Sequence, residues 1–293
     1  MRKIEILKRI FLGNEYVYNE KIKYNKQIMK NNYNEVIRLW ENNKRFHNTH
    51  NGERCFILGN GPSLKEVNLK ELSNEFVFTV NNFGFVENFT DVNTNVHLWM
   101  DNSFFMLRED QKYDERRIFE SFDLMSKVNP ICFVPYVAYP FVKENKLDEK
   151  LNINYLVLDK YLQDQVIQNF SMDKLLYCVN TVVQVAIQIA ICMGFKKIYL
   201  LGCDSTNIET IINTVLNKEN KNMHAYKNDD TDSVYKDMMA KVSMTDVFYD
   251  QYMLFLGYTL LNKYCNKNKI ELVNLTKNTL INDIKKMNIS EIL

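Results

Sequence analysis

The sequence predicts an α/β fold of the Rossmann-like kind, in which a mostly parallel sheet carries helices on both faces. Three observations predict it. Short apolar runs recur from residue 55 onward, helical stretches separate them, and 46% of the 293 residues are hydrophobic, enough to fill a sizeable core. Strands of a parallel sheet are buried on both faces, so such continuous apolar runs are what this fold requires.

Seven segments have the length and composition of buried strands. They are residues 55–58, 76–80, 96–100, 131–137, 155–158, 197–201 and 270–275. Between them, Val182–Met193 is apolar on nearly all sides and is followed by Gly194, which predicts a buried helix with a glycine C-cap. A second helix, rich in aromatic residues, is expected over Phe248–Tyr264, where it suits the core and an interface equally well.

Two regions differ from this strand-helix pattern. Residues 1–50 have apolar residues at helical spacing among lysines and asparagines, which predicts a helical N-terminal extension to a Rossmann-like domain over 51–293. Its first residues are basic and amphipathic, so peripheral contact with a membrane surface is an open alternative. Residues 205–245 are polar and weakly periodic, and we expect a lid there.

Composition excludes several classes of function. The 37 basic and 36 acidic residues nearly cancel, which argues against nucleic acid as a partner. No stretch is apolar enough for a signal peptide or a membrane span. Six cysteines lie mostly in apolar runs without zinc-site spacing, as expected for buried thiols of a cytoplasmic protein.

A glycine-containing turn follows the first strand and is the first candidate binding site. It consists of Gly59, Asn60, Gly61, Pro62 and Ser63. In a parallel sheet, ligands bind beyond the C-terminal strand ends, where glycines let the backbone approach a phosphate and the next helix offers N–H groups. Ser63 and Glu66 also have capping-box spacing, so a purely structural turn is the alternative.

Polar residues follow three further strands. Asn81 follows the second strand, Asp101 and Asn102 follow the third, and Asp204 follows the strand 197–201. Because parallel strands end at the same edge of the sheet, these side chains are expected to meet in one crevice. Amides suit a base edge, a ribose or a sugar hydroxyl, because they both donate and accept. The alternative is that each forms a local turn at its strand end.

Five segments carry a resemblance to a known family. They are GNGPSLKEVNLKELSNEF from residue 59, VNNFGF from 80, MDNSFF from 100, AIQIAICMGFKKIYLLGCD from 186 and LVNLTKNTLI from 272. In order and spacing they resemble the CMP-sialic acid-dependent sialyltransferases of Campylobacter-type surface glycans. They are also similar to motility-associated glycosylation factors and pterin-diphosphokinase-like proteins. The resemblance covers residues 54 to 282 and implies a nucleotide-sugar-binding variant of the GT-A fold.

The resemblance implies a donor-binding role for individual residues. Asn60 and the backbone of Gly59 and Gly61 would hold the CMP phosphate and ribose. The rest of the implied set is Pro62, Ser63, Asn81, Asp101, Asn102, Thr181, Asp204, Asn278 and Thr279, the last two near the cytidine.

The family transfers sugar without a metal or other cofactor, using a lid histidine as base and tyrosines at the leaving phosphate. His224, which aligns loosely with that base, and Tyr226 two residues on are the candidates for these roles here, and Asn102 is the third candidate catalytic residue. An imidazole suits proton removal near neutral pH. The alternative for His224 is an ordinary solvated loop residue. His97, within a predicted strand, is expected to be a satisfied core or crevice histidine rather than a base.

Two departures from the family pattern put the donor in doubt. Val179 stands where the family has a catalytic arginine, and Thr206 stands where it has a phosphate-binding tyrosine. The Asp-x-Asp triplet within Asp229–Asp232 lies in a polar loop, so we interpret it as a solvated acidic turn and expect no metal site.

The resemblance therefore implies transfer of sialic acid or another nonulosonic acid from a CMP donor to a hydroxyl of a glycan acceptor, in bacterial surface polysaccharide or lipopolysaccharide synthesis. Two alternatives stay open. One is a pterin pyrophosphokinase that uses ATP and a divalent ion. The other is a non-catalytic nucleotide-binding module, which the lost arginine and tyrosine would favour. Homo-oligomer formation and location at the inner face of the membrane are also open.

Overall fold

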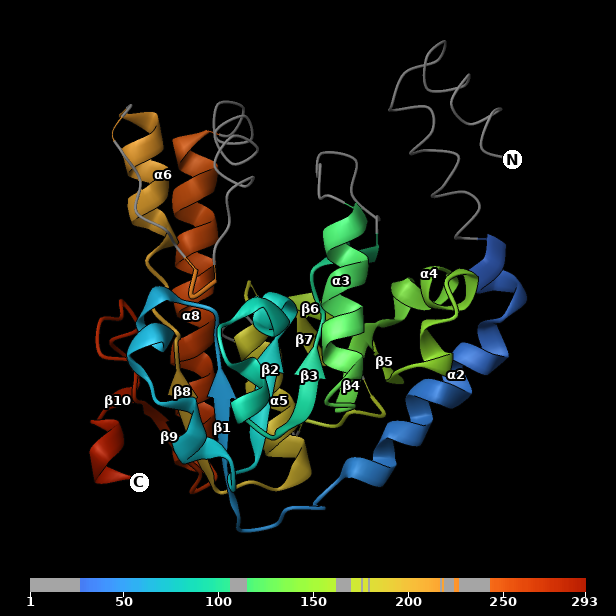
Figure 1. Cartoon of the computed structure of the whole chain (residues 1–293), viewed down its shortest axis with the longest axis horizontal. Coiled ribbons are helices and arrows are strands. Elements are labelled where there is room, and N and C mark those ends of the chain that lie inside the picture. The colour runs from blue at the N-terminus through green and yellow to red at the C-terminus, as the bar shows by residue number, and fades with distance from the viewer. Residues whose placement is uncertain are drawn as a thin grey trace.

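The structure is a computed structural model of the chain. It describes residues 27–105, 115–161, 170–174, 176–178, 180–216, 218, 224–226 and 243–293. Figure 1 shows the arrangement of these parts, with the strands in the centre and α2 at one end of the molecule.

An eight-stranded sheet in which every neighbouring pair is parallel forms the centre of the fold (Figure 1). The strand order is β10-β9-β8-β1-β2-β3-β4-β5. The strands are β1 (Arg54–Leu58), β2 (Val77–Val80), β3 (Thr94–Leu98), β4 (Ile131–Pro135), β5 (Asn152–Leu156), β8 (Lys197–Leu201), β9 (Glu271–Asn274) and β10 (Lys285–Lys286). The predicted fold class is thereby confirmed.

All seven predicted strands are present, with ends shifted by a few residues. The sequence analysis missed β10, because two exposed lysines carry no apolar pattern. It also missed a separate two-stranded sheet of β6 (Leu158–Tyr161) and β7 (Leu176–Cys178). Leu158 was assigned to the preceding strand, although the chain changes sheet after Leu156.

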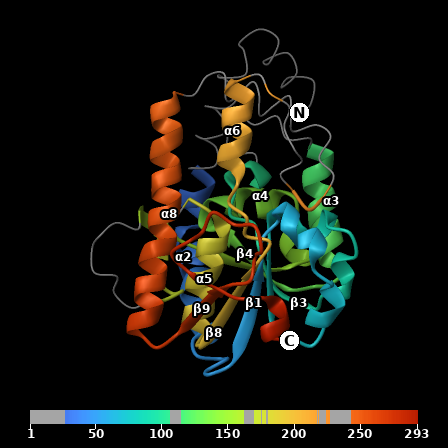
Figure 2. The same ribbon diagram turned by 90° about the vertical axis from the view of Figure 1, so that its left-hand side faces the viewer.

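Helices cover both faces of the sheet (Figure 2). On one face lie α5 (Val182–Met193) and α8 (Met244–Lys267), whose buried side chains share a core with Ile57, Phe78 and Leu200. On the other face lie α3 (Glu115–Ser126) and α4 (Tyr139–Glu144), which pack with Phe56 and Leu58. Alternate residues of one strand therefore belong to opposite cores, as the pleat of a strand requires.

Short 3-10 helices make up much of the connecting chain between β1 and β5. They are η2 (Pro62–Glu66), η3 (Leu69–Leu72), η4 (Asn81–Phe85), η5 (Phe89–Asp91), η6 (Asn102–Phe105), η7 (Tyr136–Ala138) and η8 (Leu147–Glu149), while η1 (Asn42–Phe46) precedes β1 and η9 (Ile289–Glu291) follows β10. The chain leaves β1 and β2 in such segments, so no regular helix begins at either of those strand ends.

The N-terminal extension is seen in part. Helix α2 (Tyr33–Glu41) packs against the edge strand β5 through the buried side chain of Val36. Residues 1–26, including the predicted amphipathic segment, lie outside the described residues.

The predicted lid region contains one element that the sequence analysis did not foresee, helix α6 (Asn207–Val215). Its polar residues obscure the apolar face that includes buried Ile211. Most of the chain between α6 and α8 lies outside the described residues.

Five of the six cysteines are free and buried, as expected: Cys55, Cys132, Cys192, Cys203 and Cys265. Burial raises the pKa of each of these thiols, which therefore stay protonated at neutral pH. Within the described part of the chain, none of the helices combines the length and apolar character that crossing a bilayer requires.

Helix α5 ends as predicted. Gly194 is its C-cap, with φ of +95°, and an added Cβ would lie 3.1 Å from the Cα atoms of Asn48 and Asn51. Gly52 has a comparable φ of +86°, but an added Cβ there would meet nothing within 4 Å. Alanine at Gly52 would therefore suffer only from the left-handed backbone, whereas alanine at Gly194 would suffer from the backbone and from crowding as well.

We expect Gly52→Ala to lower the free energy of unfolding by about 1 kcal/mol, from backbone strain alone. Gly194→Ala should lower it by at least about 1 kcal/mol more, because the methyl group also presses on the backbone of 48–51. Urea unfolding of both variants measures the difference. Equal losses would show that the backbone of 48–51 moves away freely.

Candidate functional site

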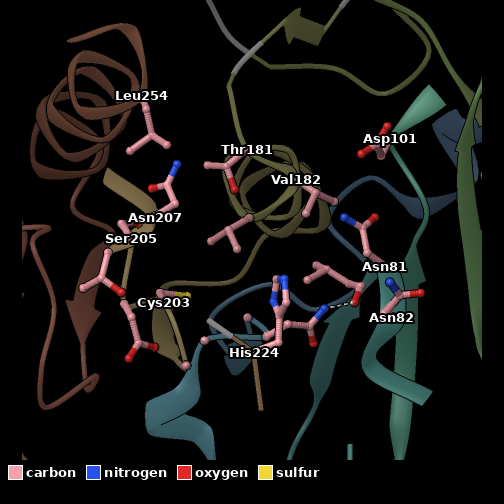
Figure 3. Close-up of a pocket in the computed structure, with 18 of the residues that line it drawn as sticks. Asn81, Asn82, Asp101, Thr181, Val182, Cys203, Ser205, Asn207, His224 and Leu254 are labelled. Atoms are coloured by element: carbon pink, nitrogen blue, oxygen red, sulfur yellow. Dashed lines mark hydrogen bonds between the residues drawn. The ribbon is translucent and has the colours of Figure 1, made fainter. Parts of the chain in front are cut away.

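Strand β1 is the topological switch point of the sheet, with β2 to β5 on one side of it and β8 to β10 on the other. From β1 the chain proceeds through β2, β3, β4 and β5 to one edge, and it then returns to place β8 against the other side of β1. The C-terminal ends of β1 and β8 therefore open into the crevice that parallel α/β sheets use for ligands. Figure 3 shows the side chains that gather there.

The crevice has two lobes. The first lobe, about 360 Å³, lies over the ends of β1, β2 and β8. The second lobe, about 690 Å³, lies over the ends of β4 and β5. They share five lining residues: Asn81, Asp101, Asn180, Thr181 and Val182. Both volumes fall in the range of small-molecule sites, and together they suit a ligand with two parts.

The two glycines of the first turn are required by the packing of β1 against β8. Gly59 N donates to Leu201 O and Gly61 N donates to Gly202 O, both at 2.8 Å. A Cβ on Gly61 would overlap the Asp204 carboxylate and come within 2.7 Å of Gly202 O, and one on Gly59 would overlap Gly202 O. Larger residues cannot be accommodated without separating the strand ends. The glycines thus give the turn its shape and leave Asn60 facing the first lobe.

Ser63 does not cap a helix, contrary to the alternative considered from its spacing with Glu66. Its backbone N–H donates to Asp204 Oδ1 at 3.1 Å, and its hydroxyl donates to Asp204 Oδ2 at 2.7 Å. The segment after it is the five-residue η2, which begins at Pro62 and has no side-chain cap. The Asp204 carboxylate therefore joins the β8 end to the β1 turn. Burial raises its pKa, although the hydrogen bonds from Ser63 oppose that shift.

Asn60 and Asn81 line the first lobe, and the amide oxygen of each is buried. Asn60 Nδ2 donates to Val80 O at 2.9 Å, which fixes the orientation of the amide. Neither Asn60 Oδ1 nor Asn81 Oδ1 has a hydrogen-bond partner among the described residues, and both atoms are buried. An unpaired buried acceptor is costly, so these oxygens favour a ligand or water that donates hydrogen bonds to them.

His97 is a satisfied core histidine, as the sequence analysis expected. Its Nδ1 lies 2.7 Å from Thr79 Oγ1 and its Nε2 lies 3.1 Å from Asn81 O. Complete burial lowers its pKa to about 3, so the ring is neutral in the folded protein at pH 7. It lines neither lobe.

The beginnings of α5 and α6 also line the first lobe. Asn180 and Thr181 precede α5, with Thr181 at its N-cap, and Ser205 and Thr206 precede α6, which begins at Asn207. Asp101 lines both lobes and Asn102 lines the second. Figure 3 shows Asn81 and Asp101 across the lobe from Ser205 and Asn207.

His224 lies between these two sides, with its ring toward the first lobe (Figure 3). Ala225 N donates to Asn60 O at 2.9 Å, which ties this segment to the first turn. Burial lowers the pKa of His224, and the charge of Arg117 lowers it further, while a hydrogen bond with the Asn60 backbone opposes both. The ring is therefore neutral at pH 7 and able to accept a proton.

Tyr226 is buried beneath His224, and their rings stack with centroids 4.8 Å apart. Its hydroxyl accepts a hydrogen bond from Asn82 Nδ2 at 3.3 Å. The Arg117 guanidinium lies 5.6 Å from the centroid of the Tyr226 ring, which adds a cation–π contact.

Four of the predicted site residues do not line the crevice. Pro62, Ser63, Asn278 and Thr279 line neither lobe. Thr279 Oγ1 donates to Cys203 O at 2.8 Å and so holds the chain just after β8, whereas Asn278 is exposed. Val179 and the Asp229–Asp232 stretch are outside the described residues.

Sequence reasoning missed several lining residues, above all Tyr258. This residue belongs to the aromatic α8, and burial raises the pKa of its phenol while the hydroxyls of Ser205 and Thr181 oppose that shift. Nothing in an apolar helix marks one tyrosine as lining a site. Asn207 was also missed, because it does not directly follow an expected strand, and Tyr136 was missed because it falls inside the expected strand 131–137, whereas β4 ends at Pro135.

Across the residues that the structure places, no three His, Cys, Asp or Glu side chains form a group able to hold a metal ion. The two lobes are lined by two carboxylates, Asp101 and Asp204, and by no lysine or arginine among their described lining residues.

Among solved structures, the chain is similar to the sialyltransferase CstII from Campylobacter jejuni, described in complex with a substrate analogue, cytidine-5'-monophosphate. The TM-score is 0.43 at 16% identity, over 80% of this chain and 85% of that chain. No family model matches this sequence, and no curated protein matches it.

The buried histidine yields a prediction for acid stability. Because the pKa of His97 falls from about 6.5 to about 3 on folding, the unfolded chain binds this proton more readily below pH 6.5. Folding stability should therefore fall as pH falls from 6.5 towards 3, with His97 contributing roughly 2 kcal/mol of loss between pH 7 and 5. Urea unfolding at both pH values measures it. His97→Gln should lose about that much less stability between pH 7 and 5. The same pH dependence in the variant and the wild type would contradict the role of His97 in acid stability.

Proposed function

We propose that the chain is a glycosyltransferase that binds a CMP-activated sugar in the two-lobed crevice and transfers the sugar to a hydroxyl of a glycan. The observation that carries this proposal is the set of neutral hydrogen-bonding groups at the β1–β8 switch point, with two buried amide oxygens that lack a donor. A cytosine amino group and the hydroxyls of a ribose or sugar are donors of the required kind. The sequence motifs at these positions support the choice of CMP.

The two lobes suggest a division of the ligand. The first lobe, with Asn60, Asp204 and Ser205, has the polar character that a nucleotide needs. The second lobe combines Tyr136, Leu156 and Leu158 with polar groups at its junction with the first, which suits a sugar with one apolar face. Asn81, Asp101 and Thr181 line both lobes, so the bond that is broken would lie beside them.

The phosphate would be held by neutral donors. Hydroxyls of Thr181, Ser205 and Thr206 line the first lobe, and two helices begin there. The first N–H groups of a helix favour an anion. The carboxylate of a nonulosonic acid would depend on the same kind of neutral donors.

His224 would act as the general base. Burial lowers the pKa of its ring, it lines the first lobe, and a neutral imidazole can accept a proton at one nitrogen while it donates from the other. In the proposed step this nitrogen takes the proton of the acceptor hydroxyl. The oxygen then forms a bond to the anomeric carbon while the bond from that carbon to the phosphate oxygen breaks, with inversion. CMP leaves with the electron pair.

The donor class is tested by thermal unfolding with CMP, CDP, UMP, UDP, GDP and ATP, each with and without magnesium. A ligand that binds only the folded state stabilises it by about 2.7 kcal/mol at a hundredfold excess over its Kd. We expect CMP and CDP to raise the Tm without magnesium. A response confined to magnesium with ATP, UDP or GDP would contradict the cytidine donor and leave the crevice as the site of another nucleotide.

The base is tested by His224→Gln, with His50→Gln as a control remote from the crevice. We expect kcat/KM to fall by roughly 10²–10⁴ in the first variant and to stay unchanged in the control. Because the pKa of His224 lies below 6.5, the wild-type kcat/KM should be flat through neutral pH and decline only in acid. Full activity of His224→Gln in transfer or in donor hydrolysis would refute this role.

A further inference from the structure

Asn81 is the residue at which the two lobes meet, and its backbone is unusual. It directly follows β2 and has φ of +47°, in the left-handed region that costs energy for residues other than glycine. This conformation lets its side chain line both lobes and leaves its buried Oδ1 without a partner among the described residues. A strained residue at a ligand junction persists only where its surroundings hold it.

His97 is the group that holds it. The ring lies on β3 beside Thr79 of β2, in direct strand register, and it is fully buried. Nε2 lies 3.1 Å from Asn81 O, and Nδ1 lies 2.7 Å from Thr79 Oγ1. A neutral imidazole carries one N–H, and Asn81 O can only accept, so Nε2 is the donor and Nδ1 accepts from the Thr79 hydroxyl. The edge of Trp99, 4.2 Å away between centroids, packs against the ring.

We propose that His97 is a positioning residue for the ligand site: its Nε2–H fixes the Asn81 carbonyl, and thereby the left-handed turn that directs the Asn81 amide into the junction of the lobes. His97 lines neither lobe, so it acts on the ligand through Asn81 alone. Without the hydrogen bond, the Asn81 peptide can turn towards a right-handed or extended conformation, which moves the amide away from the junction. This inference rests on the proposed function for its ligand, but its structural step does not.

The ligand arm of the test is a double-mutant cycle with CMP as the probe. We expect His97→Leu and Asn81→Gly each to weaken CMP at least fivefold by titration calorimetry. The double variant should bind CMP no more weakly than Asn81→Gly alone, because the histidine has no other route to the ligand. His97→Gln, which keeps a side-chain N–H, should restore part of the affinity. Additive losses would overturn the proposal, because a merely structural role would weaken both backgrounds alike.

The second arm needs no ligand. Asn81→Ala and Asn81→Gly are compared by urea unfolding in the wild-type and His97→Leu backgrounds. With His97 present, the folding equilibrium constant of Asn81→Ala should be about fivefold smaller than that of Asn81→Gly, because His97 holds residue 81 in the left-handed conformation. In the His97→Leu background that ratio should fall towards one. A ratio that stays the same would refute the positioning role.

Asn88 provides the matched control, since it is exposed and has φ of +57° but lies outside the His97 contacts. Its alanine-to-glycine ratio should be the same in both backgrounds. If wild-type protein fails to bind CMP or CDP, the proposed donor is wrong, yet the stability arm still decides whether His97 holds Asn81. If CMP binds and the stability arm fails, the donor stands and the positioning role does not.

Discussion

The close approach of the β1 turn to the end of β8 is the constraint on which the site depends. Gly59 and Gly61 hydrogen-bond to backbone carbonyls of Leu201 and Gly202, and there is no room for a side chain on either glycine. The Asp204 carboxylate then holds Ser63 on the same side. Strands β1 and β8 pair at the switch point of the sheet. The contact between their ends therefore fixes the floor of the crevice and the position of Asn60.

That contact also explains the chemistry available in the crevice. The two glycines have no side chains with which to bind a ligand. The groups available for hydrogen bonds are therefore the amides and hydroxyls of neighbouring residues: Asn60, Asn81, Thr181 and Ser205. The titratable groups nearby are shifted towards neutrality by burial, which raises the pKa of Asp204 and lowers that of His224. A pocket lined by amides and hydroxyls, with unpaired acceptors at Asn60 and Asn81, favours a ligand rich in hydroxyl and amino groups.

The sheet could be predicted from sequence because each buried parallel strand is a continuous apolar run, and the strand-end rule then correctly brought Asn60, Asn81, Asp101 and Asp204 to one crevice. The predictions that failed concerned the contacts of individual side chains. Ser63 followed helix-capping spacing, but its partner was Asp204, 141 residues away. Tyr258 and the left-handed Asn81 depend on tertiary contacts that no spacing encodes. The roles of Asn278 and Thr279 rest on the resemblance alone.

The most direct test of the account is hydrogen–deuterium exchange of the full chain with and without CMP. If CMP occupies the first lobe, amides of residues 59–64, 80–83 and 202–207 should become protected together. Residues 48–53, which lead into the other end of β1, should stay unchanged. Those three segments are far apart in sequence and meet only at the crevice. Protection confined to other parts of the chain, or none at saturating CMP, would contradict the claim that this crevice is a cytidine-nucleotide site.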